Sequence, residues 1–190
     1  MTPLDDVRAR ALKRRNALSR EERIQYSRRI CERVQPLLHG IVALYRAVGS
    51  EADLSYLDKS GLHLCLPACS KADMRFYHID ESTEYRKSRF GIWEPIHALP
   101  AEASQLDIVL VPLVAFDEAC NRMGHGCGYY DRYLPACRAT TIGIAFECQK
   151  DILQLHAHDV PLDMIVSEQQ MYRRTVSYTH LRAHETAANL

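Results

Sequence analysis

Three glycines and an aspartate lie close together in the second half of the chain, at Gly124, Gly126, Gly128 and Asp131. Alternating glycines let the backbone approach a ligand closely, and free amides ahead of a helix favour a bound anion. A carboxylate beside a phosphate supplies the hard oxygen ligand that Mg²⁺ prefers. The spacing therefore predicts a phosphate site with a metal ion beside it.

A simpler interpretation of the same residues stays open. The loop lacks the GK[ST] of a Walker A motif, and its third glycine comes one residue too early for GxGxxG. A tight turn that needs positive φ would require the same glycines, and Asp131 would then only compensate a helix dipole. The position of the loop between a buried strand and a helix start favours the phosphate site.

The glycine loop follows an apolar run, Ile108–Val111, and precedes a helix start at Tyr129. The run is short and β-branched, as in a fully buried strand, and Pro112 closes it. Ser19 and Glu22 form a capping box for a second helix. Comparable patterns predict helices over 5–17, 20–35, 51–60 and 149–156, and strands over 41–45, 62–66 (ended by Pro67), 74–79, 141–146 and 164–166, with 81–100 mostly irregular.

Strands that alternate with helical segments predict an α/β fold with three layers, α/β/α, around a mostly parallel open sheet. We expect one domain, residues 1–174. Ligands in such sheets bind at the carboxyl ends of the strands, so Glu51, the glycine loop and the segment after Phe146 should share one edge. Residues 175–190 have no apolar period and are expected to be a non-native or disordered tail.

The composition argues against several classes of protein. Basic and acidic side chains total 24 each, which gives no argument for nucleic acid or a membrane as a partner, and no obligate protein partner is evident. No apolar segment approaches the roughly 18 residues of a membrane span. The 7 cysteines include no CxxC pair, which favours reduced thiols. We therefore expect a cytoplasmic protein.

The arginine-rich first helix and a few aromatic residues have more than one possible role. The arginines would suit a solvated face, a weak contact with nucleic acid, or a grip on a triphosphate if the helix folds over the site. Trp93, Tyr129 and Tyr130 present flat surfaces that suit a heteroaromatic ligand, although core packing is the default role of such side chains. Periodicity does not choose between these roles.

The run VPLVAFDEACNRMGHGCGYYDRYL closely resembles the signature of the 5-formyltetrahydrofolate cyclo-ligase family, also called methenyltetrahydrofolate synthetases. The segments ALSREER, ALYRAVGSE, WEP, IGIAFECQ and DVPLD follow the order and spacing of the same family, so the resemblance covers roughly residues 5–170. It implies ATP- and Mg²⁺-dependent cyclisation of 5-formyltetrahydrofolate to 5,10-methenyltetrahydrofolate. ADP and phosphate would be released through a phosphorylated formyl (iminium phosphate) intermediate. Such chemistry relies on positioning and charge neutralisation, which agrees with the lack of an obvious nucleophilic triad.

The resemblance also implies roles for individual residues. Substrate contacts fall on Glu51, Trp93 and Tyr130, and magnesium ligands on Asp131 and Asp163. No side chain is assigned as a catalytic nucleophile. ATP contacts fall on the first helix and the glycine loop, at Arg8, Arg122, Met123, Gly124, His125, Gly126, Cys127, Gly128, Tyr129 and Tyr130.

Two positions depart from the family pattern. The family usually has a lysine where Leu4 stands, and many members have a lysine where Cys127 stands. Each missing cation could have contributed about 1.5–3 kcal/mol to triphosphate binding if it were buried. Either ATP binds more weakly here, or another basic residue such as Lys13, Arg15 or His125 substitutes.

Two other functions are compatible with the residues. One is a non-catalytic folate- or nucleotide-binding protein that kept the fold and lost its grip on ATP. The other is an isomerase or transferase of the wider sugar-phosphate and coenzyme A group, because such α/β sheets serve many activities.

Overall fold

The computed structural model describes residues 3–70, 73–88, 91–154 and 159–175. Three α-helices are present in these ranges: α1 (Pro3–Ala17), α2 (Arg20–Val34) and the short α3 (Tyr129–Tyr133). Four 3₁₀ turns accompany them: η1 (Gln35–Leu37), η2 (Leu54–Tyr56), η3 (Leu134–Ala136) and η4 (Glu147–Gln149). The predicted tail lies outside the described residues from position 176 onward.

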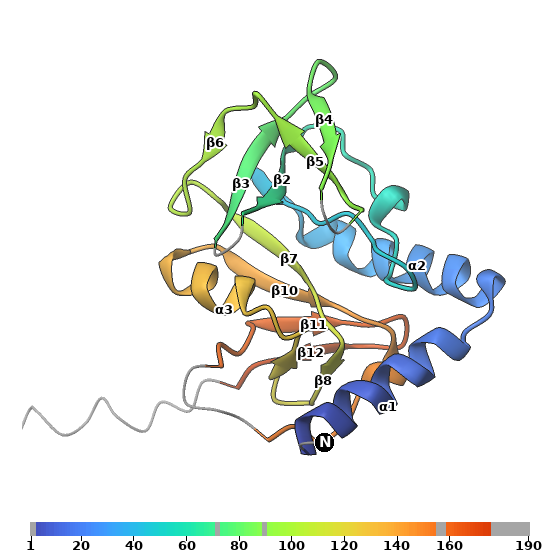
Figure 1. The fold of residues 1–190 in the computed structure, drawn as a ribbon. Helices are drawn as coiled ribbons and strands as arrows, with labels where there is room; N and C mark the ends of the chain where they lie inside the picture. Colours follow the sequence, from blue (N-terminus) through green and yellow to red (C-terminus); the bar gives the residue numbers. More distant parts are fainter. Residues whose placement is uncertain (1–2, 71–72, 89–90, 155–158, 176–190) are drawn as a thin grey trace, which may run out of the picture.

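The core of the molecule is an 8-stranded sheet in the order β12-β11-β10-β7-β1-β2-β3-β6 (Figure 1). The five strands from β11 to β2 are mutually parallel, whereas β12, β3 and β6 are antiparallel to their neighbours. The mostly parallel α/β fold is therefore confirmed. The strands of this sheet are β1 (Ile41–Ala43), β2 (His63–Cys69), β3 (Met74–Ile79), β6 (Pro100–Ala101), β7 (Ile108–Pro112), β10 (Thr140–Ile144), β11 (Met164–Val166) and β12 (Met171–Arg173).

Two small ribbons complete the strand list. The hairpin of β4 (Glu84–Lys87) and β5 (Trp93–Ile96) rises beside β2, and β8 (Ala115–Phe116) pairs with β9 (Arg122–Met123) just before the glycine loop. The hairpin falls within the stretch predicted to be mostly irregular, so that prediction was wrong for these eight residues.

Side chains of the central strands alternate between two apolar layers. In β7, Ile108 and Leu110 pack with Ile30 and Val34 of α2, whereas Val109 and Val111 face the opposite layer. Figure 1 shows α2 and α3 on opposite sides of the sheet, and Leu134, directly after α3, packs in that opposite layer. Because both faces are covered, the central strands β1 and β7 are apolar without interruption.

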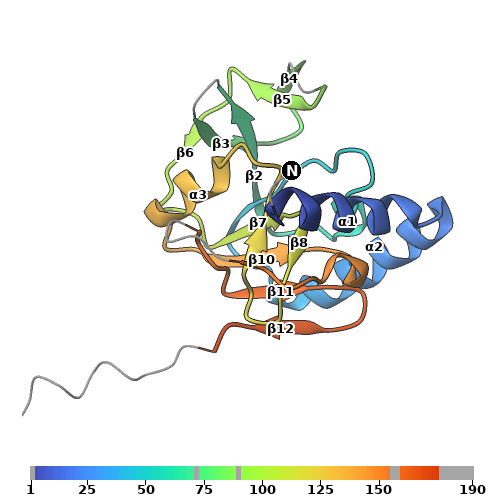
Figure 2. The same cartoon turned by 60° about the horizontal axis from the view of Figure 1, so that its bottom comes forward.

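The first two helices begin and pack as their sequences suggest. The capping box is present, since Ser19 Oγ accepts from the Glu22 amide at 3.1 Å and Glu22 Oε2 accepts from the Ser19 amide at 2.7 Å. Helix α1 buries Val7 and Ala11 against the β8–β9 ribbon rather than against the sheet. Figure 2 shows α1 crossing the region of β8, which brings this helix to the edge where the parallel strands end.

Pro67 does not end its strand as predicted. Strand β2 continues to Cys69, and Pro67 pairs with Phe76 of β3. The Cys65 carbonyl accepts from Leu44, so alternate residues of β2 face β1. Pro67 therefore points its backbone nitrogen toward β1, but β1 pairs with β2 only as far as Cys65. A proline, which has no N–H, costs no ladder hydrogen bond at this position.

Both predicted short helices are wrong in the described residues. The segment 51–60 forms only η2, because its backbone is bonded from elsewhere: Asp53 N donates to Ser27 Oγ at 3.0 Å, and Gln35 bonds both backbone groups of Asp58. The segment after Gln149 runs beside β8, where Asp151 N donates to the Phe116 carbonyl at 2.8 Å. Residues 155–156 of that second prediction lie outside the described ranges.

Two further expectations concern the molecule as a whole. None of the 7 cysteines forms a disulfide within the described chain. No helix in the described ranges is long and apolar enough to cross a bilayer.

Candidate active site

A cavity of about 850 Å³ opens at the edge where the parallel strands end. Pro112 at the end of β7 and Cys69 at the end of β2 line it, together with Glu51 from the loop after β1. Leu153 and Gln154, from the segment after Phe146, also line it. The edge predicted from the strand order therefore does gather Glu51, the glycine loop and this segment.

The glycine loop forms one wall of this cavity. Gly126 and Gly128 have φ of +96° and +66°, a region that favours glycine, and Gly128 is the N-cap of α3. Two arginines hold the loop through its carbonyls: Arg8 Nε donates to Gly124 O at 3.2 Å, and Arg132 donates to Cys127 O at 3.0 Å. The loop backbone is thus fixed in shape and flanked by positive charge.

A partly buried ion pair lies next to the loop. Arg122 donates to Asp131 Oδ1 at 2.6 Å, with side chains 3% and 28% exposed respectively. The Arg122 Nε is also buried, and it has no hydrogen-bond acceptor among the described residues. An anion held at the loop would lie beside a cation whose own hydrogen bonds are incomplete.

Glu51 forms the opposite wall. Its side chain is only 8% exposed; Oε2 accepts from the Val48 amide at 2.9 Å, and Oε1 lies 3.3 Å from His125 Nε2. His125 belongs to the glycine loop, so this contact joins the two walls. Behind Glu51, buried Arg15 donates to Ser50 Oγ at 2.9 Å.

Two tyrosines surround Glu51. Burial raises the pKa of both Tyr45 and Tyr130 well above the usual range, and the nearby Glu51 carboxylate raises both further. They therefore remain neutral phenols that can donate hydrogen bonds. Tyr45 already donates to the Ala52 carbonyl at 2.8 Å, which fixes the loop that carries Glu51.

The structure does not bring every predicted site residue to this cavity. Asp163 directly precedes β11, at the amino edge of the sheet, where Oδ2 accepts from both the amide and the hydroxyl of Thr141 at 2.8 Å. It does not line the cavity that contains Asp131, so the two predicted magnesium ligands are not brought together. Trp93 lies in an adjoining, larger cavity, although its neighbours Ile92 and Glu94 line this one.

The remaining predicted nucleotide contacts do line the cavity. Met123 contributes from the apolar cluster beneath α1, and Tyr129 anchors α3 by donating to the Ser70 carbonyl at 3.0 Å. Leu4 and the exposed Cys127 also line it, so the cavity presents an apolar side chain and a thiol at the two positions where the family resemblance leads us to expect lysines.

Arg15 and Arg132 were missed by sequence reasoning as parts of this site. Arg15 was considered only as a replacement cation, yet it is buried behind Glu51. Its spacing of seven residues from Arg8 places both arginines on one face of α1, which is the signal that could have found it. Arg132 had no comparable signal, because its role depends on a hydrogen bond to the Cys127 carbonyl, which only the folded loop places within reach.

Comparison with known proteins agrees with this geometry. The sequence profile of the 5-formyltetrahydrofolate cyclo-ligase family matches residues 4–168. A 5-formyltetrahydrofolate cyclo-ligase from Escherichia coli K12 is 28% identical over 178 residues, covering 84% of this chain and 97% of that protein. One from Haemophilus influenzae is 41% identical over 93 residues, which are 44% of this chain and 49% of that protein.

A solved structure supports the same relationship. The NMR structure of Aquifex aeolicus 5,10-methenyltetrahydrofolate synthetase superposes with a TM-score of 0.82 at 29% identity, covering 95% of this chain and 100% of that one. Fold, sequence profile and glycine-loop cavity therefore agree. The chain belongs to the 5-formyltetrahydrofolate cyclo-ligase family and is an ATP-dependent ligase that acts on folate in one-carbon metabolism.

Proposed function

We propose that the 850 Å³ cavity holds ATP at the glycine loop and the pterin of 5-formyltetrahydrofolate at Glu51, with the reacting atoms between them. The observation that carries this proposal is the 3.3 Å contact of His125 with Glu51, which joins the two walls. Ring closure needs the formyl oxygen and the γ-phosphate to meet in a fixed geometry. A single cavity with an anion end and a folate end supplies that arrangement.

The nucleotide end is built from backbone and arginines. Gly126 and Gly128 let the loop approach the phosphates without a side chain in the way, and Arg8 lies beside Gly126. Arg122 contributes a buried positive charge. Its Nε has no acceptor among the described residues, and a phosphate oxygen could accept a hydrogen bond from it. Together with Arg132, these residues supply positive charge at the nucleotide end, where Leu4 and Cys127 supply none.

The folate end is built from Glu51 and the neutral phenols around it. A buried carboxylate is a strong acceptor for the N–H groups of a pterin. Tyr130 adjoins both ends, because it follows the glycine loop and its ring lies 5.9 Å from the Arg122 guanidinium. It is therefore the residue that would contact folate and nucleotide together.

Asp131 is the carboxylate that fits a magnesium ion. No group of three or more metal-ligating side chains occurs in the described part of the chain. Mg²⁺ beside a nucleotide commonly keeps its waters, takes phosphate oxygens and uses only one or two carboxylates. Asp131 lies within this cavity and would hold the ion. When bound there, Mg²⁺ would neutralise part of the phosphate charge. Asp163 lies outside the cavity and has no such part.

The reaction follows from this placement. The formyl oxygen attacks the γ-phosphorus, ADP leaves, and the phosphorylated formyl carbon becomes an electrophile. N10 then attacks this carbon and loses its proton, and cleavage of the C–O bond releases phosphate and leaves the methenyl bridge. The arginines stabilise charge on the transferred phosphoryl group, and Glu51 holds the pterin so that N10 faces the carbon.

The full chain, mixed with 5-formyltetrahydrofolate and Mg-ATP, should produce the absorbance of the methenyl product only when ATP is present. Asp131→Asn should lower the rate at least tenfold and raise the magnesium concentration that gives half-maximal rate, because a charged ligand is lost while an acceptor for Arg122 remains. Folate binding without ATP-dependent product would overturn the proposal and favour a non-catalytic binding protein. An Asp131→Asn variant with unchanged magnesium dependence would remove Asp131 from the metal site.

A further inference from the structure

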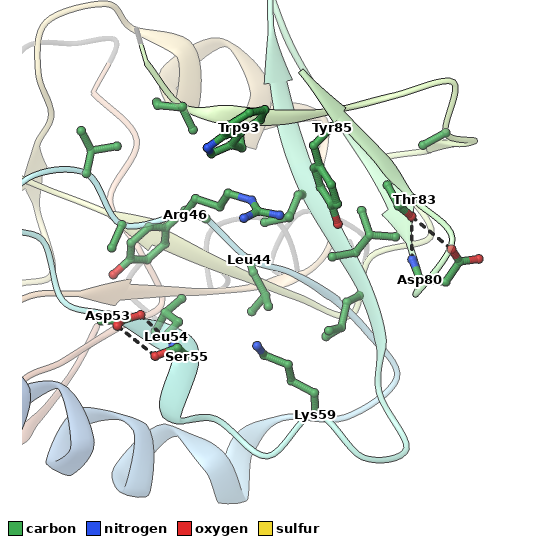
Figure 3. Close-up of a pocket in the computed structure, with 18 of the residues that line it drawn as sticks. Leu44, Arg46, Asp53, Leu54, Ser55, Lys59, Asp80, Thr83, Tyr85 and Trp93 are labelled. Carbon is green, nitrogen blue, oxygen red and sulfur yellow. Dashed lines mark hydrogen bonds between the residues drawn. The ribbon is translucent and has the colours of Figure 1, made fainter. Parts of the chain in front are cut away.

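A second and larger cavity, of about 1680 Å³, adjoins the active-site cavity. It lies between η2, β2 and the β4–β5 hairpin, on the side where Trp93 and Tyr85 are found (Figure 3). The two cavities share a wall formed by Tyr45, Arg46, Val48, Glu51 and Ile92. A ligand bound at Glu51 can therefore continue from one cavity into the other.

Four cations line the second cavity, Arg20, Arg23, Arg46 and Lys59, and none of them forms an ion pair among the described residues. Figure 3 shows the side chains of Arg46 and Lys59 directed into the same space. Arg46 instead lies over the ring of Tyr85, with 4.4 Å from its guanidinium carbon to the ring centroid. Uncompensated cations that converge on a cavity favour an anionic ligand there.

The carboxylates that line the same cavity do not cancel this charge. Asp53 accepts from the amide and the hydroxyl of Ser55, both at 2.9 Å. Asp80 accepts from Ser82, at 2.9 Å from its amide, and from Thr83, and Figure 3 shows Asp80 at the end of the cavity beyond Tyr85. Asp53 and Asp80 are thus occupied locally. Glu51, Glu81 and Glu84 also line the cavity, and none of them forms an ion pair with Arg46 or Lys59 among the described residues.

We propose that Arg46 and Lys59 bind the glutamate carboxylates of the folate substrate, which makes the second cavity the tail subsite. This rests on the proposed placement of the pterin at Glu51. The glycine loop lies on one side of Glu51, so the p-aminobenzoylglutamate portion must extend to the other side, past the shared wall. On that path the aminobenzoyl ring meets Trp93, whose exposed fraction is 51%, and Tyr85, before the glutamate reaches the two cations.

The test compares Arg46→Gln and Lys59→Gln with controls at exposed cations outside both cavities, Arg33→Gln and Arg138→Gln. Calorimetric titration with 5-formyltetrahydrofolate, without ATP, gives the dissociation constant directly. Because both cations are exposed, each substitution should weaken binding about two- to fivefold, and the double variant should weaken it further. Binding of the 5-formyltetrahydropteroyl amide, which lacks the glutamate and carries no carboxylate, should be unchanged in all variants. The controls should bind both compounds like the unaltered chain.

The outcomes separate this inference from the proposed function. Equal weakening for both compounds, or no weakening for either, would overturn the tail subsite even if the enzyme turns over normally. Tail-dependent weakening in a protein that forms no methenyl product would support the subsite and contradict the catalytic proposal. Adding sodium chloride should reduce the difference between the two compounds, because exposed ion pairs are screened.

Discussion

At the scale of single residues, the site is built from groups whose positions are fixed by hydrogen bonds. Glu51 is fixed by the Val48 amide and by the loop contact of Tyr45, and the glycine loop is fixed by Arg8 and Arg132. Most of the residues named by the family resemblance do lie in one cavity. Asp163 does not, although the sequence contained the reason: it directly precedes a parallel strand, and amino ends lie at the opposite edge from carboxyl ends.

Gly128 offers a test at this scale. Gly128→Ala places a Cβ at φ +66°, where it would lie 2.8 Å from Arg132 Nη1. Gly61→Ala, at φ +73° with no atom within 4 Å, is the matched control. Both variants should lose about 1–2 kcal/mol of unfolding free energy in urea titrations, from left-handed backbone strain. Only Gly128→Ala should raise the KM for ATP, severalfold, because Arg132 must leave the Cys127 carbonyl. An equal KM for ATP in both variants would contradict the role given to the loop.

At the scale of elements, α1 connects the two ends of the site. Arg8 reaches the glycine loop, Arg15 reaches the Glu51 loop, and Arg14 donates to the Cys148 carbonyl at 2.6 Å after β10. The helix was predictable from its composition, but its position was not. Its apolar residues contact the β8–β9 ribbon, and only the folded chain shows where that ribbon lies.

Asp151 anchors α1 and gives this element a pH dependence. Burial alone would raise the pKa of Asp151, but hydrogen bonds from Arg10 and Arg14, at 3.1 and 3.0 Å, outweigh burial and lower it. A carboxyl whose pKa is lower in the folded state adds stability above its unfolded pKa of about 3.8, and that stability is lost as pH falls through the folded value. The stability contributed by Asp151 is therefore lost as the pH becomes acidic.

The prediction compares Asp151→Asn with the unaltered chain in urea unfolding at pH 7, 5 and 3. The variant should be less stable by about 1 kcal/mol at pH 7 and pH 5, because the arginines are partly exposed. The difference should shrink toward pH 3. Glu32→Gln, which removes an exposed carboxylate of α2, should show no such convergence. A difference that stays constant down to pH 3 would contradict the ion pairs described here.

At the scale of the whole molecule, strands were more predictable than short helices. Buried β-branched runs such as those of β7 and β10 have few alternatives to a central strand. The segment 51–60 has helical spacing, but Ser27, Gln35 and Tyr45 take its backbone hydrogen bonds. All three lie outside the segment, and Ser27 and Gln35 are distant in sequence, so local propensity could not reveal them. The shared edge of Glu51 and the glycine loop was predictable, because parallel strands place their carboxyl ends together.

The central claim is that one cavity holds ATP and folate at opposite ends, and steady-state KM values for both substrates in Glu51→Gln test it most directly. Loss of a buried charged acceptor should raise the KM for 5-formyltetrahydrofolate about tenfold or more. The KM for ATP should stay within about twofold, because the hydrogen bonds from Arg8 and Arg132 that hold the glycine loop do not involve Glu51. Arg8→Gln is the matched variant and should show the reverse pattern. A Glu51→Gln enzyme whose KM rises for ATP and not for folate would contradict the account.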